Sequence, residues 1–254
     1  MRILAVQISE YNARLNYIES SNRINQWDLA FNDKLDYRYK EYLNDYFLSE
    51  GLFKLEVDEC VVSWFTPKST LVPSGLFVES NANEIFKTSF GDDFIKSNVD
   101  FNRVANLNIV NIFNTPLWLK SFFVLKYPSA VIQHEGTHVL RYLSQLVKSN
   151  SSIRAILSIQ NDYFVLIIFD NSDLKAYLIN SFEHQDDIVY HYGNAFKQLN
   201  IMDLKGELYI LSGSKITDEI ATKVEKTLLD LKLTPNMHIS TDSLIIDKAL
   251  ALCV

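Results

Sequence analysis

The segment His134-Glu135-Gly136-Thr137-His138 matches the pattern H-E-x-x-H, whose residue types and spacing are typical of a zinc site. On one helix the two imidazoles would lie on the same face and bind the metal, while the glutamate polarises a water molecule. A catalytic zinc ion also needs a third protein ligand, and Arg141 and Ser144 occupy the positions where a glycine and a histidine follow in metzincins. A zinc-dependent hydrolase is therefore a minor hypothesis.

The residues around this motif do not predict one continuous helix. Pro128 ends the preceding helix, residues 129–133 are typical of a strand, and Gly136 lies where the next helix would begin. The next glutamate after the motif is Glu183, which belongs in or beside a later strand region. We therefore expect His134 and His138 on different elements, and no metal bound by them.

Glycine usage bears on nucleotide binding, because main-chain N–H groups can approach a phosphate closely only where side chains do not intervene. The chain has only 7 glycines, where an average usage of about 7% gives roughly 18. It contains no Gly-Gly, no G-x-G and no G-x-x-x-x-G-K-[ST] sequence. This composition counts against an ordinary phosphate-binding loop.

Charge, cysteine usage and hydropathy narrow the class of protein further. A net charge of −7 without dense Lys and Arg runs argues against nucleic acid as a partner. Cys60 and Cys253 are flanked by apolar residues, as is typical of core thiols in a reducing compartment. The longest purely apolar run, 163–169, is too short to span a bilayer, and the start does not resemble a signal peptide. We expect a folded cytoplasmic protein without disulfides or membrane insertion.

Residues 153–254 show a clear order of elements. Three strand-like runs, at 153–159, 163–169 and 175–182, are separated by turn signals and predict an antiparallel meander. A helix over 186–199 follows, with apolar residues at the helical period, and then a strand at 207–212 and a helix capped by Thr217. A last strand at 237–240 and a terminal helix capped by Thr241 complete the series.

The first half of the chain repeats the opening of this order. Residues 4–8, a helix from Asp36 and the strand 59–63 correspond to 155–159, the helix from Asp186 and 207–211, at offsets of 151, 150 and 148 residues. A nearly constant offset favours internal duplication. The first half differs by an insertion at about 66–128, with strands at 99–104 and 107–113 and a helix that Thr115 would cap with Pro116 at its first position.

The order strand-strand-strand-helix-strand-helix, made twice, describes the ribonuclease-H-like unit whose duplication builds actin-like ATPases. We therefore predict an α/β protein with mixed sheets flanked by helices. The first actin-like half covers 1–150 and contains the insertion at about 66–128, and the second covers 151–254. Because one fold serves many activities, this prediction does not determine the function.

The segment 67–77 reads P-K-S-T-L-V-P-S-G-L-F. It resembles the K-x-T-L-V-P-x-x-L-F signature of an uncharacterised bacterial family with an actin-like ATPase fold, which carries a domain-of-unknown-function label. The resemblance covers the whole chain, but only Thr70 to Phe77 is specific. It implies a duplicated actin-like fold and no established activity.

Two physical interpretations of this segment are open. In the first, Pro73 keeps Val72 extended, Ser74 caps a short helix, and the large apolar side chains, Leu71, Leu76 and Phe77, fill a core. In the second, the segment is a loop that docks a partner. The packing interpretation is favoured, because a Pro-Ser turn before a helix is common packing chemistry.

In active members of this fold, two glycine-rich hairpins hold the phosphates of the nucleotide and its metal ion. The corresponding bends here are residues 8–12 and 159–163, and neither contains a glycine. Ser212, Gly213 and Ser214 resemble the strand-to-glycine turn that contacts adenosine in active relatives, although many buried strands end in such a turn. These three are the cofactor-binding residues that we expect if a nucleotide binds at all.

The leading hypothesis is a non-catalytic actin-like protein that has no cofactor and acts by binding another protein, or itself, as pilus-assembly proteins of this fold do. The reason is that the sequence predicts the actin-like fold but lacks the glycine-containing turns that bind phosphate in active members of that fold. The alternatives are an actin-like protein that binds or hydrolyses ATP with magnesium, and the zinc-dependent hydrolase.

Overall fold

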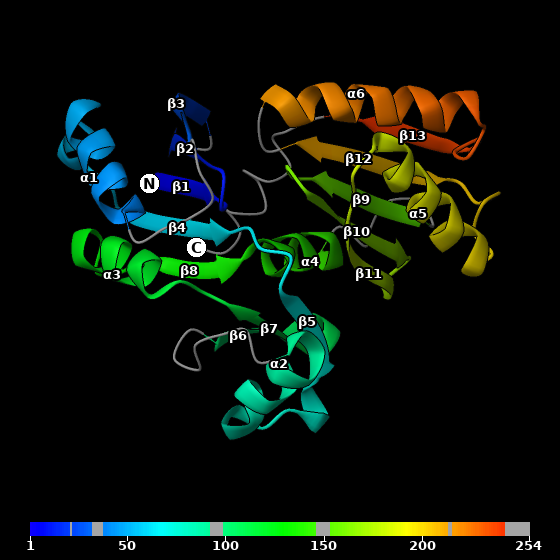
Figure 1. Cartoon of the computed structure of the whole chain (residues 1–254), viewed down its shortest axis with the longest axis horizontal. Helices are drawn as coiled ribbons and strands as arrows, with labels where there is room; N and C mark the ends of the chain where they lie inside the picture. The colour runs from blue at the N-terminus through cyan, green and yellow to red at the C-terminus, as the bar shows by residue number, and fades with distance from the viewer. Residues whose placement is uncertain (21, 32–37, 92–98, 146–152, 213–214, 242–254) are drawn as a thin grey trace. The chain divides into compact units, whose positions relative to one another are not determined.

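The computed structural model describes residues 1–20, 22–31, 38–91, 99–145, 153–212 and 215–241 (Figure 1). These residues form two compact units, one containing Met1–Val139 and the other beginning at Leu140. The predicted boundary between residues 150 and 151 lies outside the described residues, as does the predicted terminal helix that Thr241 would cap.

The first unit contains a five-stranded sheet in the order β3-β2-β1-β4-β8. β1 pairs antiparallel with β2 and parallel with β4, while β2–β3 is antiparallel and β4–β8 is parallel. The bounds are β1 Arg2–Ile8, β2 Asn12–Glu19, β3 Asn22–Ala30, β4 Glu59–Trp64 and β8 Val131–His134.

Two helices cover one face of this sheet, α1 (Tyr39–Ser49) and α3 (Leu117–Lys126). Their apolar residues recur at helical spacing and share one core with alternate residues of β1 and β4. Phe47 of α1 meets Phe122 of α3 edge to face, with ring centroids 5.2 Å apart. The short helix η1 (Leu52–Lys54) follows α1, and α4 (Glu135–Gln145) follows β8.

An inserted three-stranded antiparallel sheet, in the order β5-β7-β6, lies between β4 and α3 in the chain. Helix α2 packs on one face of it, where Phe86 meets Val110 and Ile112. The bounds are β5 Ser69–Pro73, η2 Ser74–Leu76, η3 Glu79–Asn81, α2 Ala82–Phe90, β6 Val99–Val104, η5 Ala105–Leu107 and β7 Ile109–Asn114.

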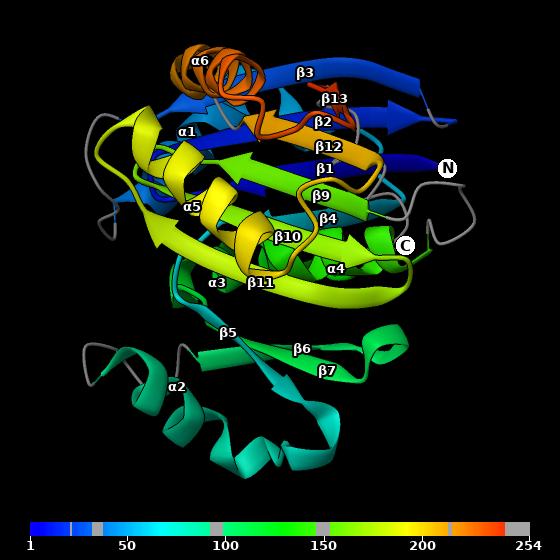
Figure 2. The same cartoon turned by 90° about the vertical axis from the view of Figure 1, so that its right-hand side faces the viewer.

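The second unit contains a five-stranded sheet in the order β11-β10-β9-β12-β13, with the same pairing directions as the first. Helices α5 and α6 lie side by side on one face of it (Figure 2). The bounds are β9 Ile153–Ile159, β10 Tyr163–Asp170, β11 Asp173–Ser181, α5 Gln185–Gln198, β12 Gly206–Ser212, α6 Lys215–Asp230 and β13 Met237–Ser240.

The two sheets are copies of one ribonuclease-H-like unit. Strands β9, β10 and β11 begin and end 151 residues after β1, β2 and β3. The pairing of the second and third strands slips at the same place in each copy, between Tyr17 and Ile18 and between Ile168 and Phe169. A bulge at the same position in both sheets is a feature that duplication explains and chance does not.

Three predicted helix caps are wrong. Helix α3 has Pro116 rather than Thr115 at its N-cap, and the Thr115 hydroxyl is buried without a hydrogen-bond partner. Ser74 is the first residue of η2, with Pro73 at the N-cap, and Thr217 lies inside α6, which begins at Lys215. In each case the expected capping residue is displaced from the N-cap position by one to three residues, because packing of the helix outweighs a cap worth about 1 kcal/mol. The predicted start of the first-half helix at Asp36 lies outside the described residues, and α1 begins at Tyr39.

Candidate functional site

His134 and His138 lie on different elements, as predicted. His134 is the last residue of β8, and His138 lies in α4. His134 is fully buried, and both nitrogens of its ring are hydrogen-bonded. Nε2 lies 3.0 Å from the carbonyl oxygen of Thr66, and Nδ1 accepts from the main-chain N–H of Gly136 at 3.0 Å.

These partners determine the protonation of the His134 ring. The Thr66 carbonyl can only accept and the Gly136 N–H can only donate, so Nε2 carries the proton and Nδ1 presents its lone pair. Burial lowers the pKa of His134 to about 4, against the hydrogen bond to Thr66, so the ring is neutral. Its lone pair is already used, and a metal ion has nothing to bind on this side chain.

His134 belongs to a buried polar cluster formed by six residues, which we name the His134 cluster. Asn111 is its centre: the side-chain amide donates to Nδ1 of His134 at 3.2 Å and to the Thr137 hydroxyl at 3.1 Å, and its carbonyl accepts from Ser69 at 2.6 Å. The cluster consists of Thr66, Ser69, Asn102, Asn111, His134 and Thr137. Because Thr66 follows β4 and the others come from β5, β6, β7, β8 and α4, the cluster joins the inserted sheet to the five-stranded sheet of the first unit. Within the described residues, no three His, Cys, Asp or Glu side chains are grouped as metal ligands.

The bend between β1 and β2 is the first of the two bends predicted to correspond to phosphate-binding hairpins. Ser9 closes it: its N–H donates to the carbonyl of Asn12 at 2.9 Å, and its hydroxyl oxygen accepts the N–H groups of Tyr11 and Asn12, both at 3.1 Å. No residue of this bend has a positive φ. Two main-chain donors that could face a phosphate are therefore directed to a serine of the same bend.

The corresponding bend of the second unit joins β9 to β10. The Gln160 N–H donates to the carbonyl of Tyr163 at 2.9 Å, and the Gln160 side chain donates to the Ser158 hydroxyl at 3.2 Å. Gln160 is buried, and this bend also lacks a residue with positive φ. Both bends are thus tight hairpins closed by a main-chain hydrogen bond, and in the first bend the Ser9 hydroxyl takes two further N–H groups.

The predicted adenosine-contacting turn is only partly described. Ser212 is the last residue of β12, and its hydroxyl hydrogen-bonds to the carboxylate of Asp218 in α6. Gly213 and Ser214 lie outside the described residues. The assignment of these three residues to a nucleotide stays a prediction.

The family segment 70–77 does not pack as predicted. Phe77 is buried against α2, but Leu76 is 76% exposed and Val78 next to it is 57% exposed. The prediction that Leu76 fills a core is wrong, because Phe77, directly after η2, and Val72 of β5 pack against this core while Leu76 faces water. A large aliphatic side chain in water at this loop is available to a partner.

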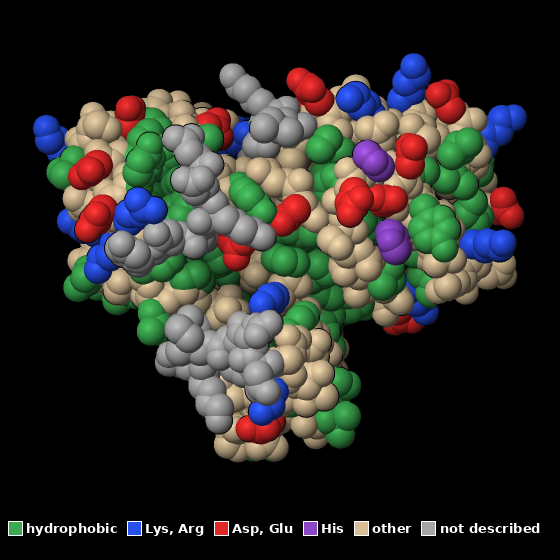
Figure 3. Space-filling view, in the orientation of Figure 1, with side chains coloured by type: hydrophobic (Ala, Val, Ile, Leu, Met, Phe, Trp, Pro, Cys, Tyr) green, Lys and Arg blue, Asp and Glu red, His purple; other side chains and the backbone are tan. Residues whose placement is uncertain are grey.

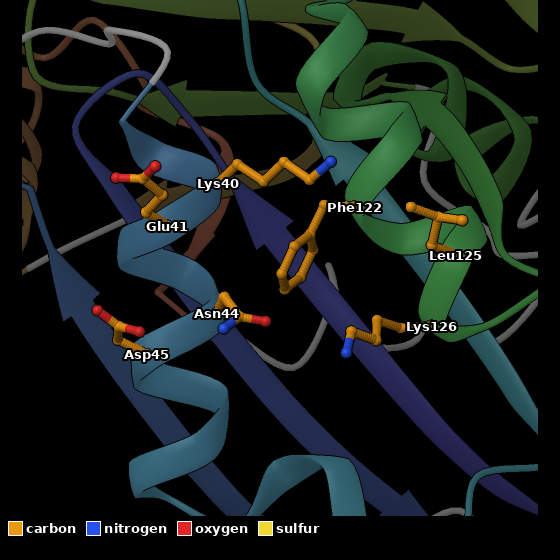
Figure 4. Close-up of a pocket in the computed structure, with 7 residues that line it drawn as sticks. All are labelled: Lys40, Glu41, Asn44, Asp45, Phe122, Leu125 and Lys126. Atoms are coloured by element: carbon orange, nitrogen blue, oxygen red, sulfur yellow. The ribbon is translucent and has the colours of Figure 1, made fainter.

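A pocket of about 350 Å³ lies between α1 and α3 of the first unit (Figure 4). Its lining residues come from both helices: Lys40, Glu41, Asn44, Asp45, Phe122, Leu125 and Lys126. Sequence reasoning missed this site, because the two helices are separated by the whole insertion and neither carries a recognisable motif. The exposed apolar side chains of α3, of which Leu125 lines the pocket, are the one signal that α3 itself offers.

The two like sheets, each in the order third-second-first-fourth-fifth strand with helices on one face, define a protein of the actin-like ATPase fold. A crystal structure from Bacteroides thetaiotaomicron, described as a protein with actin-like ATPase fold and unknown function, has a TM-score of 0.75 at 18% identity, covering 100% of this chain and 96% of that one. The chain belongs to the family described as protein of unknown function (DUF3822), whose model matches residues 2–228. The predicted resemblance to a family of unknown function with this fold is confirmed.

Two other solved structures share the fold at low identity. The PilM-PilN type IV pilus biogenesis complex has a TM-score of 0.60 at 11% identity, covering 100% of this chain and 98% of that one. The activator of 2-hydroxyisocaproyl-CoA dehydratase from Clostridium difficile, with bound ADPNP, has a TM-score of 0.50 at 7% identity, covering 100% and 94%. A search of curated protein sequences finds no significant match.

Proposed function

We propose that this protein is a cytoplasmic, non-catalytic member of the actin-like fold that works by binding another protein. The observation that carries the proposal is the closed bend of the first unit, where the Ser9 hydroxyl takes the N–H groups of Tyr11 and Asn12. In this fold a triphosphate is held by main-chain donors of such bends, and here two of them are already satisfied.

The energetics of the bend favour this proposal. To bind a phosphate, the bend would have to open and leave the buried Ser9 hydroxyl without these partners, which costs about 1–3 kcal/mol for each group left unsatisfied. This cost opposes a triphosphate at this position.

The surface and the similar structures agree with protein binding. On the face shown in Figure 3, acidic and basic side chains are interspersed with apolar ones, and the residues drawn in colour form no extended basic surface. Leu76 and Val78 are large and exposed. The PilM-PilN complex, a fold neighbour, is a protein–protein complex. For this chain the proposed partner is either a second protein or a second copy of the chain. Among the described residues no helix has the length and apolar character needed to cross a membrane.

ATP with magnesium is the alternative, favoured by one observation: a fold neighbour of similar length has ADPNP bound. Isothermal titration of the purified protein with ATP and MgCl₂ separates the two functions. We expect no heat of binding up to 1 mM nucleotide, with no ATP hydrolysis. Saturable binding tighter than about 1 mM, near −4 kcal/mol, would show that the closed bend opens and that the alternative is correct.

Light scattering of the purified chain, with a pull-down of its native partner, tests the proposal that the protein binds another protein. A stable homo-oligomer would identify a second copy as the partner, and a monomer that captures one protein reproducibly would identify a heterologous one. A monomer with no partner under any condition contradicts protein binding.

A further inference from the structure

The pocket between α1 and α3 has an apolar floor and rim. Phe122 forms the floor and is only 2% exposed, while Leu125 at the rim is 72% exposed. An apolar side chain that entered the pocket would cover Leu125 and the exposed edge of the Phe122 ring at once. Its volume of about 350 Å³ is at the small end of ligand sites, enough for one or two side chains.

Two lysines extend across the pocket from opposite sides. Figure 4 shows Lys40 pointing from α1 toward α3, and Lys126 pointing from α3 toward α1. The Lys40 ammonium donates to the Ser121 hydroxyl at 3.3 Å, and the Lys126 ammonium lies 4.1 Å from the centre of the Phe53 ring. Neither contact neutralises the charge, and each ammonium keeps donors for another acceptor.

Neither lysine forms an ion pair within the described part of the chain. The lining also carries Glu41 and Asp45, but these carboxylates project from the other side of α1, away from the apolar floor. The two ammonium groups, which lie on either side of that floor, complement a ligand that is apolar in the middle and carries carboxylates on both sides.

The remaining lining residues set the orientation of such a ligand. Asn44 points into the pocket, where its amide can bond the main chain of a peptide. Glu41 and Asp45 project from the other side of α1 in Figure 4, and they repel a ligand whose negative charge extends over that helix. Carboxylates are therefore accepted at the lysines and rejected beyond α1.

We propose that the pocket between α1 and α3 binds a short segment of the partner protein in which an apolar or aromatic side chain is flanked by acidic residues. The proposal rests on the proposed function and names the surface and the partner's chemistry. The apolar side chain covers Phe122 and Leu125, and the flanking carboxylates pair with Lys40 and Lys126.

Fluorescence anisotropy with three labelled peptides of identical core tests the proposal on the whole chain. Each peptide has Leu-Phe in the centre, flanked on both sides by Glu, by Gln or by Lys. We expect the Glu peptide to bind about tenfold more tightly than the Gln peptide, with the preference lost at high salt, and the Lys peptide to bind weakest.

Matched variants locate the binding. The double variant K40Q/K126Q should weaken the Glu peptide about tenfold and leave the Gln peptide unchanged, and Leu125→Ser, which removes apolar surface without adding charge, should weaken all three. The control is K197Q/K223Q, which removes the same charge from exposed positions of the second unit and should change nothing. All these side chains are half-buried or exposed, and circular dichroism confirms that each variant folds.

Several results would overturn the proposal. They are equal binding of the three peptides, tightest binding of the Lys peptide, no binding of any peptide at 5 mM protein, or an unchanged Glu-peptide affinity in K40Q/K126Q. If a native partner is captured equally by the parent and by K40Q/K126Q, the pocket proposal fails while the proposed function stands. If the chain binds ATP with magnesium, the proposed function fails whatever the peptides do.

Discussion

Replacing His134 by leucine gives the sharpest test of the role assigned to the H-E-x-x-H segment. Leucine has a similar volume and no polar atoms, so the change removes hydrogen bonds without opening a large cavity. The carbonyl of Thr66 and the N–H of Gly136 then lose their partners in a fully buried place. Asn111 keeps only its bonds to Thr137 and Ser69.

The expected loss follows from those groups. A buried donor or acceptor left unsatisfied costs about 1–3 kcal/mol. Two main-chain groups therefore give about 2–6 kcal/mol, and the apolar burial of leucine offsets part of it. We expect a loss of about 3 kcal/mol, which is a large share of the 5–15 kcal/mol that stabilises an ordinary domain.

Urea unfolding followed by circular dichroism measures this loss. The control is His238→Leu, which changes an exposed histidine of β13 and should stay within about 0.5 kcal/mol of the parent. A chelator such as EDTA should not change the stability of the parent. A loss below about 1 kcal/mol for His134→Leu, or destabilisation of the parent by EDTA, would refute the structural role of His134.

Three further predictions concern stability. Burial lowers the pKa of His134 to about 4, so between pH 6.5 and pH 4 the unfolded chain binds more protons than the folded one. Acid should therefore remove about 3 kcal/mol of stability over that window. In a pH series of urea unfolding, His134→Leu should lack this pH-dependent loss. Gly206→Ala should lower stability by about 2 kcal/mol in thermal unfolding, because a Cβ there would lie 2.7 Å from the Cβ of Ile153, and an unchanged midpoint would contradict this close approach. Phe77→Ala should cost about 3 kcal/mol and Leu76→Ala less than about 0.5, so similar losses in urea would show that Leu76 is packed after all.

Much of the second unit was predictable from residue types alone. The runs 153–159 and 163–169 are almost wholly apolar, and both became buried strands with the predicted start, because such runs have no stable alternative to the centre of a sheet. The strands predicted at 99–104 and 237–240 are also confirmed at both ends. The actin-like fold followed from the order of these elements and is confirmed.

The first unit was harder to predict. The repeated element order implied strands β2 and β3 without giving their bounds, because their polar residues give no clean alternation and β3 is mostly exposed at the edge of the sheet. They are strands because β1 offers a hydrogen-bonding edge, and a partner strand in three dimensions outweighs a weak local preference. The helix caps were misplaced for the same kind of reason.

The sequence by itself determined the class of fold, the separation of His134 from His138 by a strand-to-helix junction, and the lack of glycine in both hairpin bends. Each of these depends on residues close together in the chain, where local geometry decides. Only the tertiary structure decided that Asn111 completes the bonding of His134, that Leu76 faces water, and that Lys40 and Lys126 share one pocket. Those facts depend on which distant segments meet in the fold. The burial and pairing energies between such segments cannot be read from the local sequence pattern.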